Sequence, residues 1–504
     1  MLDVRNLQTT HGEIIDLADP ELDQFKMWQV PSNLSSTKHS LVMSNDPFFM
    51  LRGYTQRYFH EQGKDFKKLI AVDFFIPTTG YSNFDSGGNL VIDWSLRDQQ
   101  LEFLISYFEN FEDINKDLII SFCDESPQLK DILETLYSLM ALYDIPEHRV
   151  MIMGHNFAGQ EIINQYAKDN GEVPLKYIVA WWMLGHLNCD HVEKLVQNKQ
   201  PFNLNERNSG KHKLQSVDMS PRDNTFIFLN RRETGNRLAL AWLLWERTIK
   251  AYHNIISVCP PLRLFGIDPN RPDKTDSEGE IRNHYTEIFF QTLFKNLHPE
   301  AVSYIDQDMV NRFIEEMRVG KTLPGDHMFI GDTESKHIPQ DNNAYIWLTC
   351  ESTSELTEKN LFFTEKVLKP MVYGQALVVF AQPGFLKAFK QLGFYTLADE
   401  LGIDESYDDI ENDAERLKFI ADQMEQISTV PLLDLHQRYL QCEQKIKHNK
   451  KMMFSMLSNI NNNFIQKQSE FIVNSICSRG FVNTSSKTLE IYKNLFALEL
   501  IEDN

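Results

Sequence analysis

The stretch FIFLNRRETGNRLALAWLLWER, residues 226–247, joins two local patterns without a gap. It begins with four consecutive apolar residues, passes through a polar turn, and continues from Arg237 with apolar residues at helical spacing. A short unbroken apolar run is typical of a strand buried on both faces, and the second pattern is typical of an amphipathic helix. A strand followed at once by a helix predicts the repeating unit of a parallel α/β sheet.

The same alternation extends through most of the chain. Strands are expected at residues 68–75, 117–122, 149–153, 175–183, 225–229, 254–258, 345–349 and 376–380, and helices at 99–111, 127–143, 158–168, 237–253, 282–297 and 365–373. The polar stretch 205–224 separates these elements into two groups and is predicted to be a linker. We therefore expect an irregular N-terminal arm (1–45), a first α/β domain (46–220), a second α/β domain (221–430) and C-terminal helices (431–504) that cross back to brace the first domain.

Composition limits the class of protein. A chain of 504 residues is too long for one compact core, and its 42% apolar and 24% charged residues are those of an ordinary soluble globular protein. No apolar run approaches the roughly 18–20 residues that span a bilayer, and the N-terminal sequence lacks the pattern of a secretory signal. Six cysteines are scattered singly, which favours reduced thiols in the cytoplasm over a disulfide framework or a zinc site.

The net charge of −21 argues against a broad nucleic-acid surface, because such surfaces neutralise phosphates with Lys and Arg. It leaves room for a local basic cleft. The densest basic stretch, residues 445–451, is predicted to be the exposed face of a long helix.

Ligands of open parallel sheets bind outside the carboxyl ends of the strands, so residues that follow strands are the first candidates for a site. In EKNLFFTEKVLKP, residues 358–370, Thr364 is placed to cap a helix whose first turn holds Glu365 and Lys366. A helix N-terminus binds anions, Lys366 adds a cation, and Glu365 can accept hydrogen bonds from a ribose diol. The alternative is a capped surface helix with a solvated Glu–Lys pair. If Lys366 does bind the anion, Lys366→Ala should remove most of the function while leaving folding nearly intact, because a solvated Lys contributes little stability.

A second candidate lies at the turn after residues 225–229. Asn230 and Arg232 follow the strand, and Arg237 opens the next helix. Clustered arginines repel one another unless an anion or acidic partner lies among them, and Arg is suited to bidentate phosphate contacts. Glu233 and other carboxylates could instead satisfy them. No GxGxxG or P-loop motif is present, so side chains would have to hold the phosphates.

These residues carry a resemblance. The stretch YIWLTCES…FFTEKVLKPMVYGQALVVFAQPGFLKAFKQLGFYT, residues 345–396, resembles the donor-binding domain of the alpha-1,3-fucosyltransferase family and its phage and giant-virus relatives. The Asn-plus-Arg turn at 230–237 is similar to an earlier turn of that domain, and residues 404–408 and 446–449 resemble the viral relatives. The likeness covers roughly residues 225–450, and the Thr-Glu-Lys segment is its most specific part.

The resemblance implies a GT-B architecture, in which two Rossmann-like domains face a cleft and the second holds a nucleotide sugar. It implies that Glu365 binds the ribose and that Lys366 and Arg237 contact the diphosphate, with further donor contacts from Asn230, Arg232, Glu351 and Thr364. Ser352 stands where the family has the Asn of its Glu-Asn pair, so the donor base and sugar are left open. An inverting outcome and a viral source, hence host cytoplasm, are likewise implied only by the resemblance.

The expected reaction needs neither a metal nor a cofactor. Fixed cations and helix dipoles can stabilise the charge that develops on a departing nucleoside diphosphate, and no DxD motif occurs at the expected metal loop. A general base must then activate the acceptor hydroxyl, and the first candidates are Asp124 and Glu125, with Asp73, His155 and His186 in reserve. The acceptor is a glycan or a hydroxymethylated base in phage DNA. The rival hypothesis is a non-catalytic α/β scaffold that binds a nucleotide or a protein partner.

The sequence Gly154-His155-Asn156-Phe157-Ala158-Gly159 has the spacing of a nucleophile elbow, but Asn156 cannot attack a carbonyl. An α/β-hydrolase is therefore rejected. The glycines are expected to let this loop approach an acceptor closely.

Overall fold

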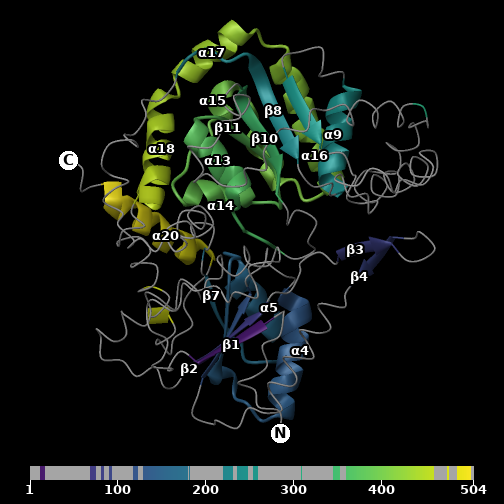
Figure 1. Cartoon of the computed structure of the whole chain (residues 1–504), viewed down its shortest axis with the longest axis vertical. Helices are drawn as coiled ribbons and strands as arrows, with labels where there is room; N and C mark the ends of the chain where they lie inside the picture. Colours follow the sequence, from purple (N-terminus) through teal and green to yellow (C-terminus); the bar gives the residue numbers. More distant parts are fainter. Residues whose placement is uncertain are drawn as a thin grey trace, which may run out of the picture.

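The computed structural model describes residues 12–16, 69–74, 81–84, 90–93, 117–122, 129–179, 181, 219–230, 235–247, 254–258, 308, 344–351, 359–458, 471, 474–475 and 485–500. These residues form a mixed α/β protein with two separate sheets of mainly parallel strands (Figure 1), which confirms the predicted class. The helices expected at 99–111 and 282–297 and most of the 205–224 linker lie outside the described residues.

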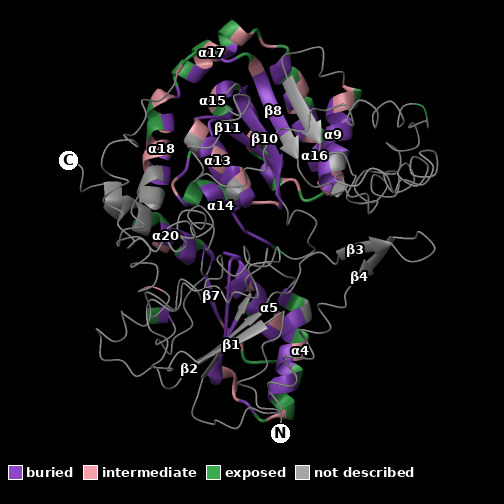
Figure 2. Cartoon of the chain, in the orientation of Figure 1, coloured by how far each residue is buried: buried purple, intermediate pink, exposed green. Residues whose placement is uncertain are grey.

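The second sheet unit is built on four parallel strands in the order β11-β10-β8-β9. They are β8 (Asn224–Asn230), β9 (Asn254–Val258), β10 (Ala344–Cys350) and β11 (Ala376–Phe380). Every residue of β10 and of the edge strand β11 is buried (Figure 2). Strands covered on both faces need apolar side chains at successive positions, which explains the unbroken runs in the sequence.

Strand order places the two crossover helices of this unit on opposite faces. From β8 the chain passes through α9 (Gly235–Glu246) to β9 on one side, and from β10 through α13 (Glu365–Tyr373) to β11 on the other. Because crossovers are right-handed, opposite directions of travel put α9 and α13 on opposite faces of the sheet (Figure 1). The direction reverses between β8 and β10, and such a reversal opens a crevice at the carboxyl ends of these two strands.

The first sheet unit has five strands in the order β1-β2-β5-β6-β7. Its strands β2 (Leu69–Phe74), β5 (Asp117–Phe122), β6 (Val150–Gly154) and β7 (Lys176–Val179) are parallel, with α4 (Leu129–Leu142) and α5 (Gly159–Asn170) between them in sequence. β1 (Gly12–Asp16) pairs antiparallel with β2. The N-terminal arm expected to be irregular therefore supplies an edge strand. β3 (Tyr81–Phe84) and β4 (Leu90–Asp93) pair with each other as a separate antiparallel pair.

A series of helices follows β11. They are α14 (Phe385–Gln391), α15 (Ala398–Leu401), a 3₁₀ turn η8 (Glu405–Asp409), α16 (Asp413–Ser428), α17 (Leu432–Leu440), α18 (Glu443–Ser458) and α20 (Ser485–Leu500). α16 packs on α9, and α18 packs on α13. α20 contacts α14 and α18 of the second sheet unit and α5 of the first, and it lies between the two units in Figure 1.

Aromatic rings form much of the contact between the two sheet units. Trp181, directly after the first sheet, packs edge-on against Phe157, Phe363 and Tyr492 with ring centroids 5.7, 6.1 and 6.0 Å away. Tyr492 of α20 donates to the Val179 carbonyl and accepts from the Trp181 amide. Within the described part of the chain, no helix is both long and apolar enough to cross a bilayer.

Candidate functional site

Arg237 and the start of α13 both lie at the carboxyl end of β10. Arg237 lies in the first turn of α9, is only 3% exposed, and its guanidinium Nη2 lies 3.5 Å from the Cys350 carbonyl at the end of β10. The next residue, Glu351, contacts the start of α13. Helices from opposite faces of the sheet thus bring their N-terminal turns to the β8–β10 reversal.

Thr364 and Glu351 organise the start of α13. Thr364 has extended backbone angles and its hydroxyl accepts a hydrogen bond from the Lys366 amide at 3.2 Å, which confirms it as the N-cap. Its amide and its hydroxyl both reach the carboxylate of Glu351, at 3.2 Å and 2.8–2.9 Å. The Glu351 side chain is fully buried, so this carboxylate positions the cap from inside the protein.

Lys366 is held near the same carboxylate. Its ammonium Nζ lies 3.8 Å from Glu351 Oε2 and 3.3 Å from the Thr364 hydroxyl, and its side chain is 21% exposed. The picture of a solvated lysine is therefore wrong, because Lys366 compensates a buried negative charge. Its side chain is partly accessible from solvent.

The remaining predicted residues are described only in part. Asn230 is the last residue of β8 and Glu365 the first of α13, and the structure describes their backbone but not their side chains. Arg232, Asp124, Glu125 and His186 lie outside the described residues, and Asp73 is described only as part of the β2 backbone.

The 154–159 turn connects β6 to α5 and packs around one tyrosine. A Cβ at Gly154 would lie 2.5 Å from the Tyr177 hydroxyl, and a Cβ at Gly159 would overlap the Tyr177 ring. The same hydroxyl accepts a hydrogen bond from the Asn156 amide at 3.1 Å. The glycines therefore make room for a buried tyrosine, and the expectation that they admit an acceptor is wrong. The ring of His155 stacks on Phe362, 5.6 Å between centroids.

A cleft of about 600 Å³ opens beside this joint, between the two sheet units and α20. Its lining includes Glu161 of α5, the segment 359–361, the start of α14, the η8–α16 turn and the start of α20. The charged residues along it are Glu161, Lys359, Lys387, Asp408, Asp409, Glu411 and Asp413. Five carboxylates against two lysines give this cleft an acidic lining, which the sequence did not predict because the residues come from distant segments.

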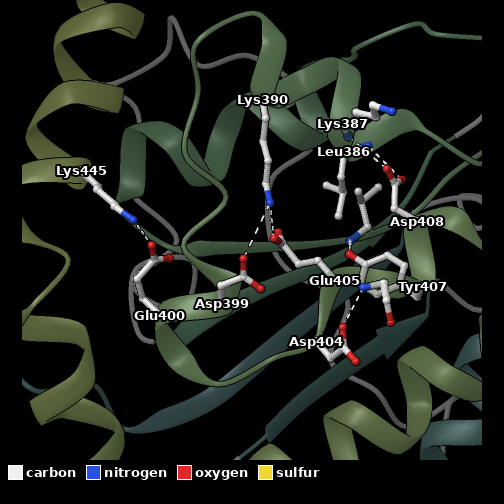
Figure 3. A network of polar contacts seen from close by, with 12 residues as sticks. Leu386, Lys387, Lys390, Asp399, Glu400, Asp404, Glu405, Tyr407, Asp408 and Lys445 are labelled. Carbon is white, nitrogen blue, oxygen red and sulfur yellow. Dashed lines mark hydrogen bonds and ion pairs between the residues drawn. The ribbon is translucent and has the colours of Figure 1, made fainter.

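Two carboxylates of η8, Asp408 in the cleft lining and Glu405, are largely buried in a polar network (Figure 3). Asp408 accepts hydrogen bonds from the amides of Leu386 and Lys387 at 2.9 and 3.0 Å, which satisfies the first turn of α14. Burial nevertheless raises the pKa of Asp408, because the loss of hydration outweighs these bonds. Glu405 pairs with Lys390, and burial likewise raises its pKa. This network stabilises the packing of α14 on η8.

Searches against protein-family models, characterised proteins and solved structures found no match to this chain. Among the residues that the structure describes, no three His, Cys, Asp or Glu side chains are grouped as metal ligands.

Proposed function

We propose that the chain is a metal-independent glycosyltransferase of GT-B form, which moves a sugar from a nucleoside-diphosphate donor to an acceptor hydroxyl. The observation that carries this proposal is that Arg237 and Lys366 lie beside two successive residues, Cys350 and Glu351, at the carboxyl end of β10. Two cations and the N-terminus of a nine-residue helix, α13, are thus near the same strand end, and together they would stabilise a pyrophosphate bound there.

The chemistry follows from charge. As the bond between the sugar and the diphosphate breaks, negative charge grows on the leaving nucleoside diphosphate and positive charge on the sugar ring. Arg237, Lys366 and the α13 dipole would stabilise the leaving group, while Glu365 would accept hydrogen bonds from the ribose diol. Asp124 and Glu125 remain the candidate bases for the acceptor hydroxyl.

The acidic cleft bears on the choice of acceptor. Its five carboxylates would repel a polyanion, whereas carboxylates and the amide of Gln382 suit the hydroxyl groups of a glycan. A glycan is therefore favoured over a hydroxymethylated base in DNA.

One observation favours the rival, a non-catalytic scaffold. Glu351 is buried and already makes an ion pair with Lys366, so the pair could serve only to fix the start of α13. The two hypotheses differ in whether Lys366 also binds an anion.

A thermal-shift panel of nucleoside diphosphates and their sugars, with and without EDTA, distinguishes the transferase from the non-catalytic scaffold. A ligand that binds only the folded state at 100 times its Kd adds about 2.7 kcal/mol of stability, or roughly 2–3 °C for a chain of 504 residues that unfolds as one unit. We expect one base to give this shift, EDTA to leave it unchanged, and Lys366→Met to reduce it while Lys369→Met, on the same helix, keeps it.

Because Glu351 is buried, Lys366→Met should also lower the free energy of unfolding by about 1–3 kcal/mol, and adding Glu351→Gln should restore part of it. The shift must therefore be measured in the double variant as well. No shift with any nucleotide would overturn the proposal.

A further inference from the structure

One buried side chain of the first sheet unit holds the segment that leads into α13. Asn156, which is 0% exposed, donates from Nδ2 to the Lys359 carbonyl at 3.0 Å. Its Oδ1 accepts from the Leu361 amide at 2.9 Å and from the Ala158 amide of its own turn at 2.9 Å. A single amide therefore satisfies two backbone groups of a segment more than 200 positions away in the sequence.

Two more hydrogen bonds extend the same contact. The Phe157 amide donates to the Leu361 carbonyl at 3.1 Å, and the Trp181 indole Nε1 donates to the Phe363 carbonyl at 3.0 Å. Leu361, Phe363 and Thr364 are each 3% exposed or less. Buried polar groups are costly to leave unpaired, so the 359–363 segment has one favoured position against the first sheet unit.

The next residue along the chain is the Thr364 cap. Phe363, whose carbonyl accepts the hydrogen bond from Trp181, directly precedes in sequence the turn that carries Glu365 and Lys366. A displacement of residues 359–363 would therefore displace this turn relative to Arg237, which belongs to a different helix. The 154–159 turn is itself held in place, because the backbone N–H of Asn156 donates to the Tyr177 hydroxyl.

We propose that Asn156 is a positioning residue, through which the first sheet unit fixes the anion-binding turn at 364–366. This inference rests on the proposed function for its ligand, a nucleoside diphosphate, but not for its mechanical part. It assigns a role to a turn that has the spacing of a nucleophile elbow and no nucleophile. Donor binding is then coupled to the docking of the two sheet units.

The test is hydrogen exchange on the full chain, comparing wild type with Asn156→Ala and Asn156→Asp. Loss of the two bonds that Asn156 makes to residues 359 and 361 should raise the exchange rates of amides 361–367 about tenfold in the alanine variant. The aspartate variant is the same size and keeps an acceptor for the Leu361 and Ala158 amides, but it cannot donate to the Lys359 carbonyl and buries a charge beside it, so these rates should rise in this variant as well. Gln165→Ala, at an exposed amide of α5, is the matched control and should leave these rates unchanged.

The second readout is donor kinetics with the nucleotide sugar identified by the thermal-shift panel. We expect KM for the donor to rise about tenfold in Asn156→Ala and to rise in Asn156→Asp as well, with kcat changed much less in both variants. Unchanged exchange at 361–367 would overturn the inference, and so would faster exchange with an unchanged KM. If wild-type protein binds no nucleotide, the proposed function fails, and exchange alone decides whether Asn156 fixes this segment.

Discussion

Glu405 illustrates how burial and pairing compete at a single residue. Its carboxylate makes an ion pair with Lys390, yet burial raises its pKa because the lost hydration outweighs the nearby cation. Asp399, 3.9 Å from the same ammonium, adds a repulsive charge (Figure 3). One carboxylate oxygen of Glu405 is buried without a hydrogen-bond partner. The site therefore stabilises the ionised carboxylate less than water would.

This predicts an unusual pH dependence. At pH values between the ordinary pKa of 4.5 and the raised pKa in the folded protein, Glu405 is protonated when folded and ionised when unfolded. Its contribution to the stability of the folded protein therefore falls as pH rises through this range. Glu405→Gln has no carboxyl group to titrate here, so it should not show this loss of stability with rising pH. At pH 7 the variant should be as stable as the wild type, or more stable by about 1 kcal/mol. Urea unfolding of both proteins between pH 4 and pH 7 measures the difference.

The matched control removes the cation instead. Lys390→Met leaves the Glu405 carboxyl buried without its cation, and should be more destabilising at pH 7 than at pH 4. A loss of stability well above 1 kcal/mol for Glu405→Gln at pH 7 would contradict the argument from burial.

At Lys366 the sequence and the structure lead to different expectations. A lysine in a helix N-terminal turn is usually solvated, and nothing local to Thr-Glu-Lys indicates otherwise. The structure pairs it with Glu351, fifteen residues earlier and at the end of another element. Local spacing predicted the cap made by Thr364 but could not predict this partner, because sheet topology brings the two residues together.

At the level of elements, the β6–α5 turn depends on two glycines for different reasons. A Cβ at Gly154 would meet chiefly the Tyr177 hydroxyl, whereas a Cβ at Gly159 would meet the ring carbons. Each substitution to alanine should therefore cost about 1–3 kcal/mol. Only the Gly154→Ala cost should be reduced when Tyr177→Phe removes the hydroxyl. Denaturant unfolding of the single and double variants gives the two coupling energies.

Tyr177→Phe alone is the baseline, because it also removes the acceptor of the Asn156 amide. Equal coupling energies at the two glycines would show that the turn relaxes as a unit, against this account.

Which elements could be predicted follows from their burial. The strands β8, β10 and β11 are covered on both faces and appear as unbroken apolar runs, so the sequence located them closely. β1, with the sequence GEIID, carries three polar or glycine positions in five and was not predicted, because only pairing with β2 makes it a strand. α14 was also missed: it spans seven residues and begins after Gly384 in the left-handed region, so it has no N-cap signature.

At the level of the whole molecule, alternation of strands and helices predicted two sheets but not the contact between them. That contact depends on pairs such as Asn156 with Leu361 and Trp181 with Phe363, which lie far apart in the sequence. Aromatic and amide residues at these positions are equally suited to a local core. Only the meeting of the two sheet units gives them a role in the candidate site.

The net charge of −21 and the acidic cleft together predict that the protein does not bind DNA. A duplex would approach a surface that repels it, and the two lysines of the cleft are outnumbered by five carboxylates, so hydroxymethylated DNA should not bind. Fluorescence anisotropy with a labelled hydroxymethylcytosine duplex at about 50 mM salt should show no binding at micromolar protein, where a DNA-modifying enzyme would bind. An unmodified duplex of the same sequence is the control.

Saturable binding whose log K falls steeply with log salt would reveal several phosphate contacts. Such binding would make DNA the acceptor in place of a glycan, because only a basic surface could overcome this net charge.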